Sequence, residues 1–291
     1  MTSTKRFQGL GVALITPFKE DNTIDYQALE NLLNHLKDID FLIVFGTTGE
    51  NPTLSLPEKQ AVLQFIKTHS KLPIVLGIGG NNTTHILDQF NAFDFKDIDA
   101  ILSVTPYYNK PNQAGLLAHY TQLADNAPKP IILYNVPSRT AVNLSAETTL
   151  KLAEHPNIIG IKEASGDFQQ IMTILQQRPN NFSVLSGDDA LTLPLLSIGI
   201  DGLISVIGNA FPTETKAMVW NGLKNQFSQA KTQHYKLLPF IEAIFADGNP
   251  SGIKYLLSAM HLIEPYLRLP LVDINDKTKK RLDNLLGKWE K

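Results

Sequence analysis

Short apolar runs recur along the chain at spacings of about thirty residues, the length of a β-strand followed by a helix. Each run is continuous and rich in β-branched side chains, which is typical of parallel strands buried on both faces. Eight such runs predict strands at residues 12–15, 41–45, 74–78, 100–104, 131–134, 158–162, 182–185 and 202–206.

Between these runs, apolar residues follow the spacing of amphipathic helices. Residues 26–36 place their leucines on one helical face, which predicts a helix there. Another helix is predicted to begin after Ser55, because Ser55 and Glu58 form the sequence of a capping box. Residues 144–152 predict a further helix.

Eight strands that are each followed by a helix predict an α/β protein with a closed (β/α)8 TIM barrel. A doubly wound open sheet would more often have fewer strands and a glycine-rich turn after the first strand, which residues 15–18 do not supply. We therefore expect a barrel catalytic domain of residues 1–225 and a C-terminal helical extension of residues 226–291. Helical periodicity after the last strand covers residues 213–234, 235–246, 251–262 and 276–286.

The composition narrows the possible functions. The formal net charge is −2, so no overall field attracts nucleic acid. The chain has no cysteine, which excludes disulfides, thiol nucleophiles and cysteine-ligated metal sites. No apolar stretch approaches the roughly 20 residues that cross a bilayer. Residues 1–6 lead into no apolar segment of a secretory signal, so we expect a cytoplasmic protein without a membrane partner.

Lys162 lies near the end of the sixth apolar run, in the sequence Ile-Ile-Gly-Ile-Lys-Glu of residues 158–163. Holding an ammonium charged inside such a strand is costly, because desolvation favours the neutral amine. A neutral amine is a nucleophile toward carbonyl compounds. A lysine at a strand end also commonly extends to water, so this residue alone does not establish catalysis.

The reactive groups of a TIM barrel lie at the C-terminal ends of its strands. Gly-Thr-Thr-Gly-Glu at residues 46–50 follows the second strand, and its glycines predict a tight turn that cradles a small carboxylate. Tyr134 ends the fifth strand next to Lys162, and Arg139 after it offers a planar fork for a carboxylate. After the seventh strand, Asp188 or Asp189 is expected to cap the following helix.

Four motifs occur in the order and spacing of one known family. They are Gly-Thr-Thr-Gly-Glu (46–50), Thr-Pro-Tyr-Tyr-Asn-Lys-Pro (105–111), Tyr-Asn-Val-Pro-Ser-Arg-Thr (134–140) and Gly-Ile-Lys-Glu-Ala-Ser-Gly-Asp (160–167). From about Gly9 to residues 268–271, the chain resembles the dihydrodipicolinate synthase family of the class I pyruvate aldolase or N-acetylneuraminate lyase superfamily.

The resemblance implies a lyase of lysine biosynthesis that condenses pyruvate with L-aspartate 4-semialdehyde through a Schiff base, without metal or cofactor. It implies a homo-oligomer, commonly a dimer of dimers, in which Tyr108 crosses the tight-dimer interface. It implies these roles: Lys162 as the imine-forming lysine; Tyr134, Thr47 and Tyr108 as a proton relay; Thr48 and Arg139 as carboxylate ligands; and the backbone near Gly187 and Ile204 as pocket lining.

The resemblance also locates departures from the lysine-inhibited members of the family. Leu56 and Lys59 stand where those members have two histidines, and His85 stands where they have a glutamate. These changes remove partners for a bound lysine. We therefore expect feedback inhibition by lysine to be weak or absent.

Two alternatives stay open at this point. The first is a lyase of the same superfamily that acts on N-acetylneuraminate or a 2-keto-3-deoxy sugar acid. Arg139 argues against it, because a polyhydroxy substrate needs hydroxyl partners there. The second is a barrel that binds a keto acid without catalysis, against which the intact set of Lys162, Tyr134 and Thr47 argues.

Overall fold

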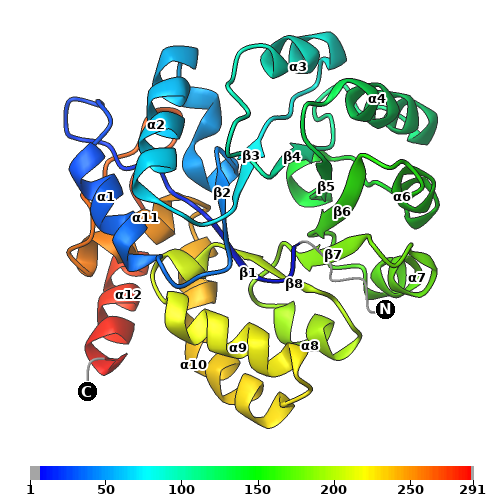
Figure 1. Ribbon diagram of the computed structural model, residues 1–291. Coiled ribbons are helices and arrows are strands. Elements are labelled where there is room, and N and C mark those ends of the chain that lie inside the picture. Colours follow the sequence, from blue (N-terminus) through cyan, green and yellow to red (C-terminus); the bar gives the residue numbers. More distant parts are fainter. Residues whose placement is uncertain (1–6, 290–291) are drawn as a thin grey trace.

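The computed structural model describes residues 7–289, and the stretch 1–6 considered for a secretory signal lies outside them. Eight parallel strands close into one barrel in chain order, as the sequence predicts (Figure 1). The strands are β1 (Gly9–Ala13), β2 (Phe41–Val44), β3 (Ile74–Gly77), β4 (Ala100–Val104), β5 (Ile131–Asn135), β6 (Ile158–Glu163), β7 (Ser183–Ser186) and β8 (Gly202–Ser205).

Helices surround the barrel, and the chain ends in further helices. The barrel helices are α1 (Tyr26–His35), α2 (Leu56–His69), α3 (Thr83–Phe90), α4 (Gln113–Asn126), α5 (Pro137–Thr140), α6 (Ala146–Ala153), α7 (Phe168–Gln177), α8 (Thr192–Ser197) and α9 (Pro212–Leu223). The last three are α10 (Phe227–Phe245), α11 (Ser251–Ala259) and α12 (Asp276–Trp289). The capping box at the start of α2 is confirmed, with Ser55 and Glu58 each accepting the other's backbone N–H.

The first strand begins earlier than the predicted 12–15, because β1 must pair with β8 to close the barrel. Gly9 is in register with Gly202, and both have positive φ angles, of 93° and 159°. A Cβ on Gly202 would lie 2.1 Å from the carbonyl oxygen of Gly9. Two glycines at the seam therefore allow the close backbone approach that an apolar pattern does not reveal.

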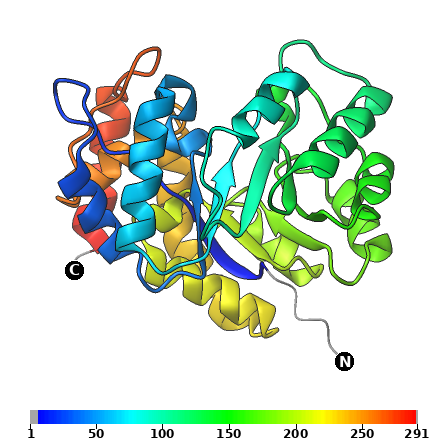
Figure 2. The ribbon, with the colours of Figure 1, turned by 45° about the horizontal axis from the view of Figure 1, so that its top comes forward.

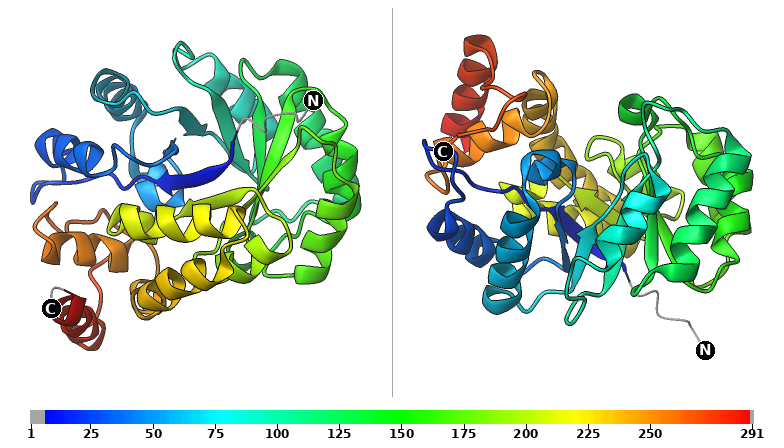
Figure 3. Two further views of the ribbon diagram at one scale, coloured as in Figure 1. Left: turned by 60° about the horizontal axis from the view of Figure 1, so that its bottom comes forward. Right: turned by 90° about the horizontal axis from the view of Figure 1, so that it is seen from above.

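The predicted boundary between two helices, at 213–234 and 235–246, is wrong. The first ends at Leu223, and Asn225 turns the chain with a φ of 60°. The second is one helix from Phe227 to Phe245 that contains Pro239. Apolar periodicity continues across this turn because α9 and α10 pack side by side (Figure 3). The division into domains at residue 225 stays a prediction.

Two apolar clusters organise the molecule. The larger lies between the strands and the surrounding helices. The smaller fills the barrel interior, where Phe7 packs edge-on against Phe41 at 5.2 Å between ring centroids. This interior cluster includes Tyr134 at the end of β5. These apolar side chains therefore occupy the barrel interior up to the level of Tyr134.

The C-terminal helices cover one side of the barrel. α10 packs on α9, and α11 and α12 pack against α10 and against each other (Figures 1 and 2). Within residues 7–289, no helix is long and apolar enough to cross a membrane.

Candidate active site

Strand register places Lys162 inside the barrel. Lys162 on β6 pairs with Tyr134 on β5 and with Leu185 on β7, and both neighbours belong to the interior cluster. Lys162 is 6% exposed, and its Nζ lies 4.3 Å from the centroid of the Tyr134 ring. The prediction that Tyr134 lies next to Lys162, at the C-terminal ends of neighbouring strands, is confirmed.

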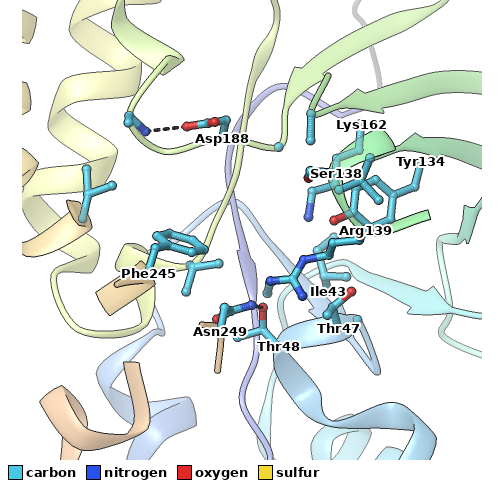
Figure 4. Close-up of a pocket in the computed structure, with 18 of the residues that line it drawn as sticks. Ile43, Thr47, Thr48, Tyr134, Ser138, Arg139, Lys162, Asp188, Phe245 and Asn249 are labelled. Carbon is cyan, nitrogen blue, oxygen red and sulfur yellow. Dashed lines mark hydrogen bonds between the residues drawn. The ribbon is translucent and has the colours of Figure 1, made fainter. Parts of the chain in front are cut away.

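A cavity of about 330 Å³ opens above this lysine. Lys162, Tyr134 and Arg139 lie on one side of it, and Phe245 faces them from the other (Figure 4). The lining residues are Ala13, Ile43, Gly46, Thr47, Thr48, Leu102, Tyr134, Val136, Ser138, Arg139, Lys162, Ala164, Gly187, Asp188, Ala190, Val206, Ile241, Glu242, Phe245 and Asn249. The cavity is large enough for a small organic molecule. Its lining offers that molecule the amine of Lys162, the guanidinium of Arg139 and the polar side chains of Thr47 and Thr48.

The turn after β2 supplies Thr47 and Thr48 to the cavity. It is a short 3-10 helix, Thr47–Gly49, whose first two N–H groups have no partner inside the helix and are available to a ligand. The predicted tight turn is present, since the Gly49 N–H bonds to the Gly46 carbonyl oxygen at 3.1 Å, but the residue in the left-handed conformation is Glu50, with a φ of 54°. Gly49 serves close packing instead, since a Cβ there would lie 3.0 Å from the carbonyl oxygen of Leu14.

Arg139 extends into the cavity from the short helix α5. Pro137 occupies the first position of this helix, and Ala141 ends it in the left-handed conformation. Arg139 makes no ion pair within the described part of the chain, and its guanidinium points toward Thr48 and Asn249 (Figure 4). A guanidinium held over a cavity without a carboxylate partner is suited to bind one from a ligand.

Gly187 packs directly against the stem of Lys162. A Cβ at Gly187 would lie 2.8 Å from Cε of Lys162 and 2.8 Å from Cβ of Ala164. The residue therefore leaves room for the lysine side chain to reach the cavity.

The predicted helix cap at Asp188 or Asp189 is wrong, because α8 begins only at Thr192 and has no side-chain cap. Asp188 instead accepts hydrogen bonds from the N–H groups of Ala190 and Leu191. Asp189 is buried and accepts hydrogen bonds from Ser205 Oγ at 2.5 Å and from the Val206 N–H at 2.9 Å. Burial raises the pKa of Asp189 to about 6. Asp189 thus joins the loops that follow β7 and β8.

A buried carboxylate lies behind the reactive strand ends. Asn135 and Glu163 follow Tyr134 and Lys162 in sequence, so their side chains face the opposite side of the sheet. Glu163 accepts hydrogen bonds from Asn135 Nδ2 at 3.2 Å, from Gln170 Nε2 at 3.2 Å and from the Ser165 N–H at 2.7 Å. Burial raises the pKa of Glu163, and the hydrogen bonds oppose that effect. The network therefore holds β5 and β6 together on the outer face of the barrel.

Two residues named from the sequence lie outside the cavity lining. Ile204 is buried inside the barrel, and Val206 on the same segment lines the cavity instead. Tyr108 is 89% exposed and has a φ of 71°. Its assigned role requires a neighbouring subunit and stays a prediction.

Sequence reasoning missed the contribution of the C-terminal helices. Asn249, between α10 and α11, donates a hydrogen bond from Nδ2 to Thr48 Oγ1 at 3.0 Å (Figure 4). Its Oδ1 is buried without a hydrogen-bond partner within residues 7–289, so this oxygen is free to accept one from a ligand. Ile241 and Phe245 of α10 complete the wall. No sequence signal found Asn249, because the strand pattern locates only strand ends.

Comparison with known proteins shows similarity to one family along nearly the whole chain. Residues 6–288 match the model of the Dihydrodipicolinate synthetase family. The chain is 48% identical over 282 residues to 4-hydroxy-tetrahydrodipicolinate synthase of Flavobacterium psychrophilum, covering 95% of this chain and 96% of the relative.

Solved structures show the same fold. The structure is similar to dihydrodipicolinate synthase from Aquifex aeolicus, with a TM-score of 0.93, 38% identity and 98% coverage of both chains. It is also similar to the chloride-inhibited enzyme from Acinetobacter baumannii complexed with pyruvate, with a TM-score of 0.91, 37% identity and coverage of 96% of this chain and 98% of that one. On the extent of these matches, the chain belongs to the dihydrodipicolinate synthetase family.

Proposed function

We infer that this chain condenses pyruvate with L-aspartate 4-semialdehyde to 4-hydroxy-tetrahydrodipicolinate, in the diaminopimelate route to lysine. The observation that carries this conclusion is a buried lysine, Lys162, whose amine lies beside the Tyr134 ring at the base of a cavity. Relatives that are nearly half identical carry the name of this synthase, and the similar A. baumannii structure holds pyruvate.

The reaction begins at the amine of Lys162. The amine adds to the keto carbon of pyruvate and water leaves, which forms an imine. Loss of a methyl proton gives an enamine, whose carbon attacks the aldehyde of the second substrate and forms the new C–C bond. The amino group of the adduct then attacks the imine carbon, closes the ring and releases Lys162. A covalent adduct thus replaces one difficult carbanion step with easier ones.

The neighbouring side chains serve binding and proton transfer in this proposal. Thr48 and the free N–H groups of its turn hold the pyruvate carboxylate. Tyr134, Thr47 and the Tyr108 of a neighbouring subunit pass protons to and from the substrate. The backbone at Gly187 lines the pyruvate site, and Ile204 supports it from below. The exposure of Tyr108 fits a residue that enters the site of a neighbouring subunit on assembly. We expect a dimer of dimers in the cytoplasm.

Replacing Arg139 with alanine is expected to impair the second substrate selectively. Arg139 would bind the carboxylate of the semialdehyde, and loss of a charged hydrogen bond lowers kcat/KM for it by about ten- to a hundredfold. Imine formation with pyruvate should persist. Initial rates at varied semialdehyde concentration measure kcat/KM for the second substrate, and borohydride trapping with pyruvate measures imine formation. Arg139→Lys retains charge without the fork and serves as the control. Loss of imine formation in Arg139→Ala would contradict this role.

A coupled condensation assay tests the function itself. Pyruvate is supplied with L-aspartate 4-semialdehyde in one reaction, and cleavage of N-acetylneuraminate or of a 2-keto-3-deoxy sugar acid is followed in others. We expect turnover with the semialdehyde only. Preferential cleavage of a sugar acid would establish the alternative lyase, and absence of turnover in every reaction would favour a binding barrel.

L-Lysine is expected to inhibit the initial rate weakly or not at all. Leu56 is 44% exposed and Lys59 adds a cation, so neither offers an acceptor to the ammonium groups of lysine. Initial rates with and without added L-lysine measure the effect. Half-inhibition at a low lysine concentration would show that other residues replace the missing partners.

A further inference from the structure

We propose that the buried ion pair between Glu50 and Lys254 positions the Thr47–Thr48 turn, so that the C-terminal helices form part of the pyruvate-carboxylate site. This inference rests on the proposed function, in which Thr48 holds that carboxylate. Glu50 and Lys254 are positioning residues, because neither lines the cavity.

The pair is completely enclosed. Lys254 Nζ lies 2.5 Å from Glu50 Oε1, and both side chains are 0% exposed. The same Nζ donates a hydrogen bond to the carbonyl oxygen of Tyr266 at 2.8 Å and lies 4.1 Å from the centroid of the Phe18 ring. The other oxygen of Glu50 accepts a hydrogen bond from the Arg268 N–H at 3.1 Å. Three segments of the chain therefore meet at one carboxylate.

A second link joins the same two parts of the molecule. Asn249 lies just before α11, which carries Lys254, and it bonds to Thr48. Glu50 follows Thr48 by two residues. Two contacts thus join the turn to the start of α11. One is the ion pair between Glu50 and Lys254, and the other is the hydrogen bond from Asn249 to Thr48. Movement of Lys254 would move both Thr48 and Asn249.

The backbone of Glu50 explains why a strong tie is needed. Its left-handed conformation is unfavourable for a residue with a Cβ and persists only where the surroundings hold it. Packing alone would favour an apolar pair, since buried ion pairs are often no more stabilising than apolar replacements. Burial also lowers the pKa of Lys254 to about 8. An ion pair that is costly to bury and lies beside the cavity therefore points to a role in positioning the turn.

The test compares Lys254→Met with the double variant Glu50→Gln/Lys254→Met. The single variant leaves a buried charge unpaired, whereas the double variant removes both charges and recovers stability. Arg178→Met is the matched control, because it breaks another buried ion pair, with Asp201 at the N-terminal end of β8. Thermal unfolding, KM for pyruvate and kcat are measured for all of them.

We expect KM for pyruvate to rise roughly ten- to a hundredfold in both Lys254 variants, because small misplacements of binding groups have effects of that size. The rise should persist in the double variant after its stability recovers, and Arg178→Met should lose stability with an unchanged KM. A KM that returns to normal in the double variant, or one that rises equally in Arg178→Met, would overturn the proposal.

The same samples also test the proposed function independently. Borohydride trapping at saturating pyruvate should label Lys162 in the unchanged protein and in every variant. Absence of label in the unchanged protein would defeat the proposed function, and with it the stated role of the turn. Labelling everywhere with KM values that follow stability would defeat the positioning role alone.

Discussion

Replacement of Lys162 by methionine is expected to abolish condensation and to leave the protein at least as stable as before. Lys162 Nζ makes no hydrogen bond or ion pair within residues 7–289, although the residue is 6% exposed. Because Nζ faces the cavity and the change to methionine breaks no hydrogen bond or ion pair among these residues, the free energy of unfolding should not fall. Loss of the nucleophile should lower kcat by roughly 10⁴-fold or more. Chemical denaturation and the condensation assay measure both.

The Lys254→Met variant supplies the contrast. Lys254 is completely buried and is paired with Glu50, so its replacement leaves a carboxylate uncompensated. We expect a loss of about 3–5 kcal/mol in the free energy of unfolding. If Lys162→Met lost as much stability as Lys254→Met, the amine of Lys162 would have a structural partner and the interpretation of it as a free nucleophile would be wrong.

Gly187→Ala is expected to lower kcat/KM for pyruvate by about a hundredfold, because it displaces the lysine from its reactive position. The added Cβ would lie 2.8 Å from Lys162 Cε, which is closer than carbon atoms pack. Adjustment of the neighbouring side chains should cost about 1–3 kcal/mol of stability. Steady-state kinetics, with the rate of imine trapping measured in parallel, distinguish this from a loss of folded protein.

Gly287→Ala is the matched control. Gly287 lies in α12, and a Cβ there would meet no atom within 4 Å. The change should stabilise the helix by up to about 1 kcal/mol without altering activity. Full activity in Gly187→Ala would show that the lysine stem has room to spare and that Gly187 does not shape the site.

The barrel was predictable because its strands are buried on both faces. Continuous apolar runs such as 131–134 and 158–162 identify a strand without any knowledge of its neighbours. Once the barrel is inferred, chain order places the ends of β5 and β6 side by side, and Tyr134 and Lys162 follow. Arg139 was predictable for the same reason, since it comes soon after a strand end.

The rest of the site depends on contacts that no local pattern encodes. Asn249 and Lys254 belong to the C-terminal helices, and nothing in their apolar periodicity states which loop of the barrel they reach. Asp189 looks like a helix cap in sequence, but it bonds to the loop after β8 because the barrel brings that loop beside it. Glu50 takes a conformation usually reserved for glycine, although two glycines stand in the same turn.

The most direct measurement is borohydride reduction in the presence of pyruvate, followed by peptide mass analysis. An imine formed on the shielded amine should be reduced to a stable secondary amine, which adds one carboxyethyl group, the mass of reduced pyruvate less one water, to the peptide that contains Lys162. Unlabelled protein, or label on another lysine such as Lys254, would contradict the mechanism.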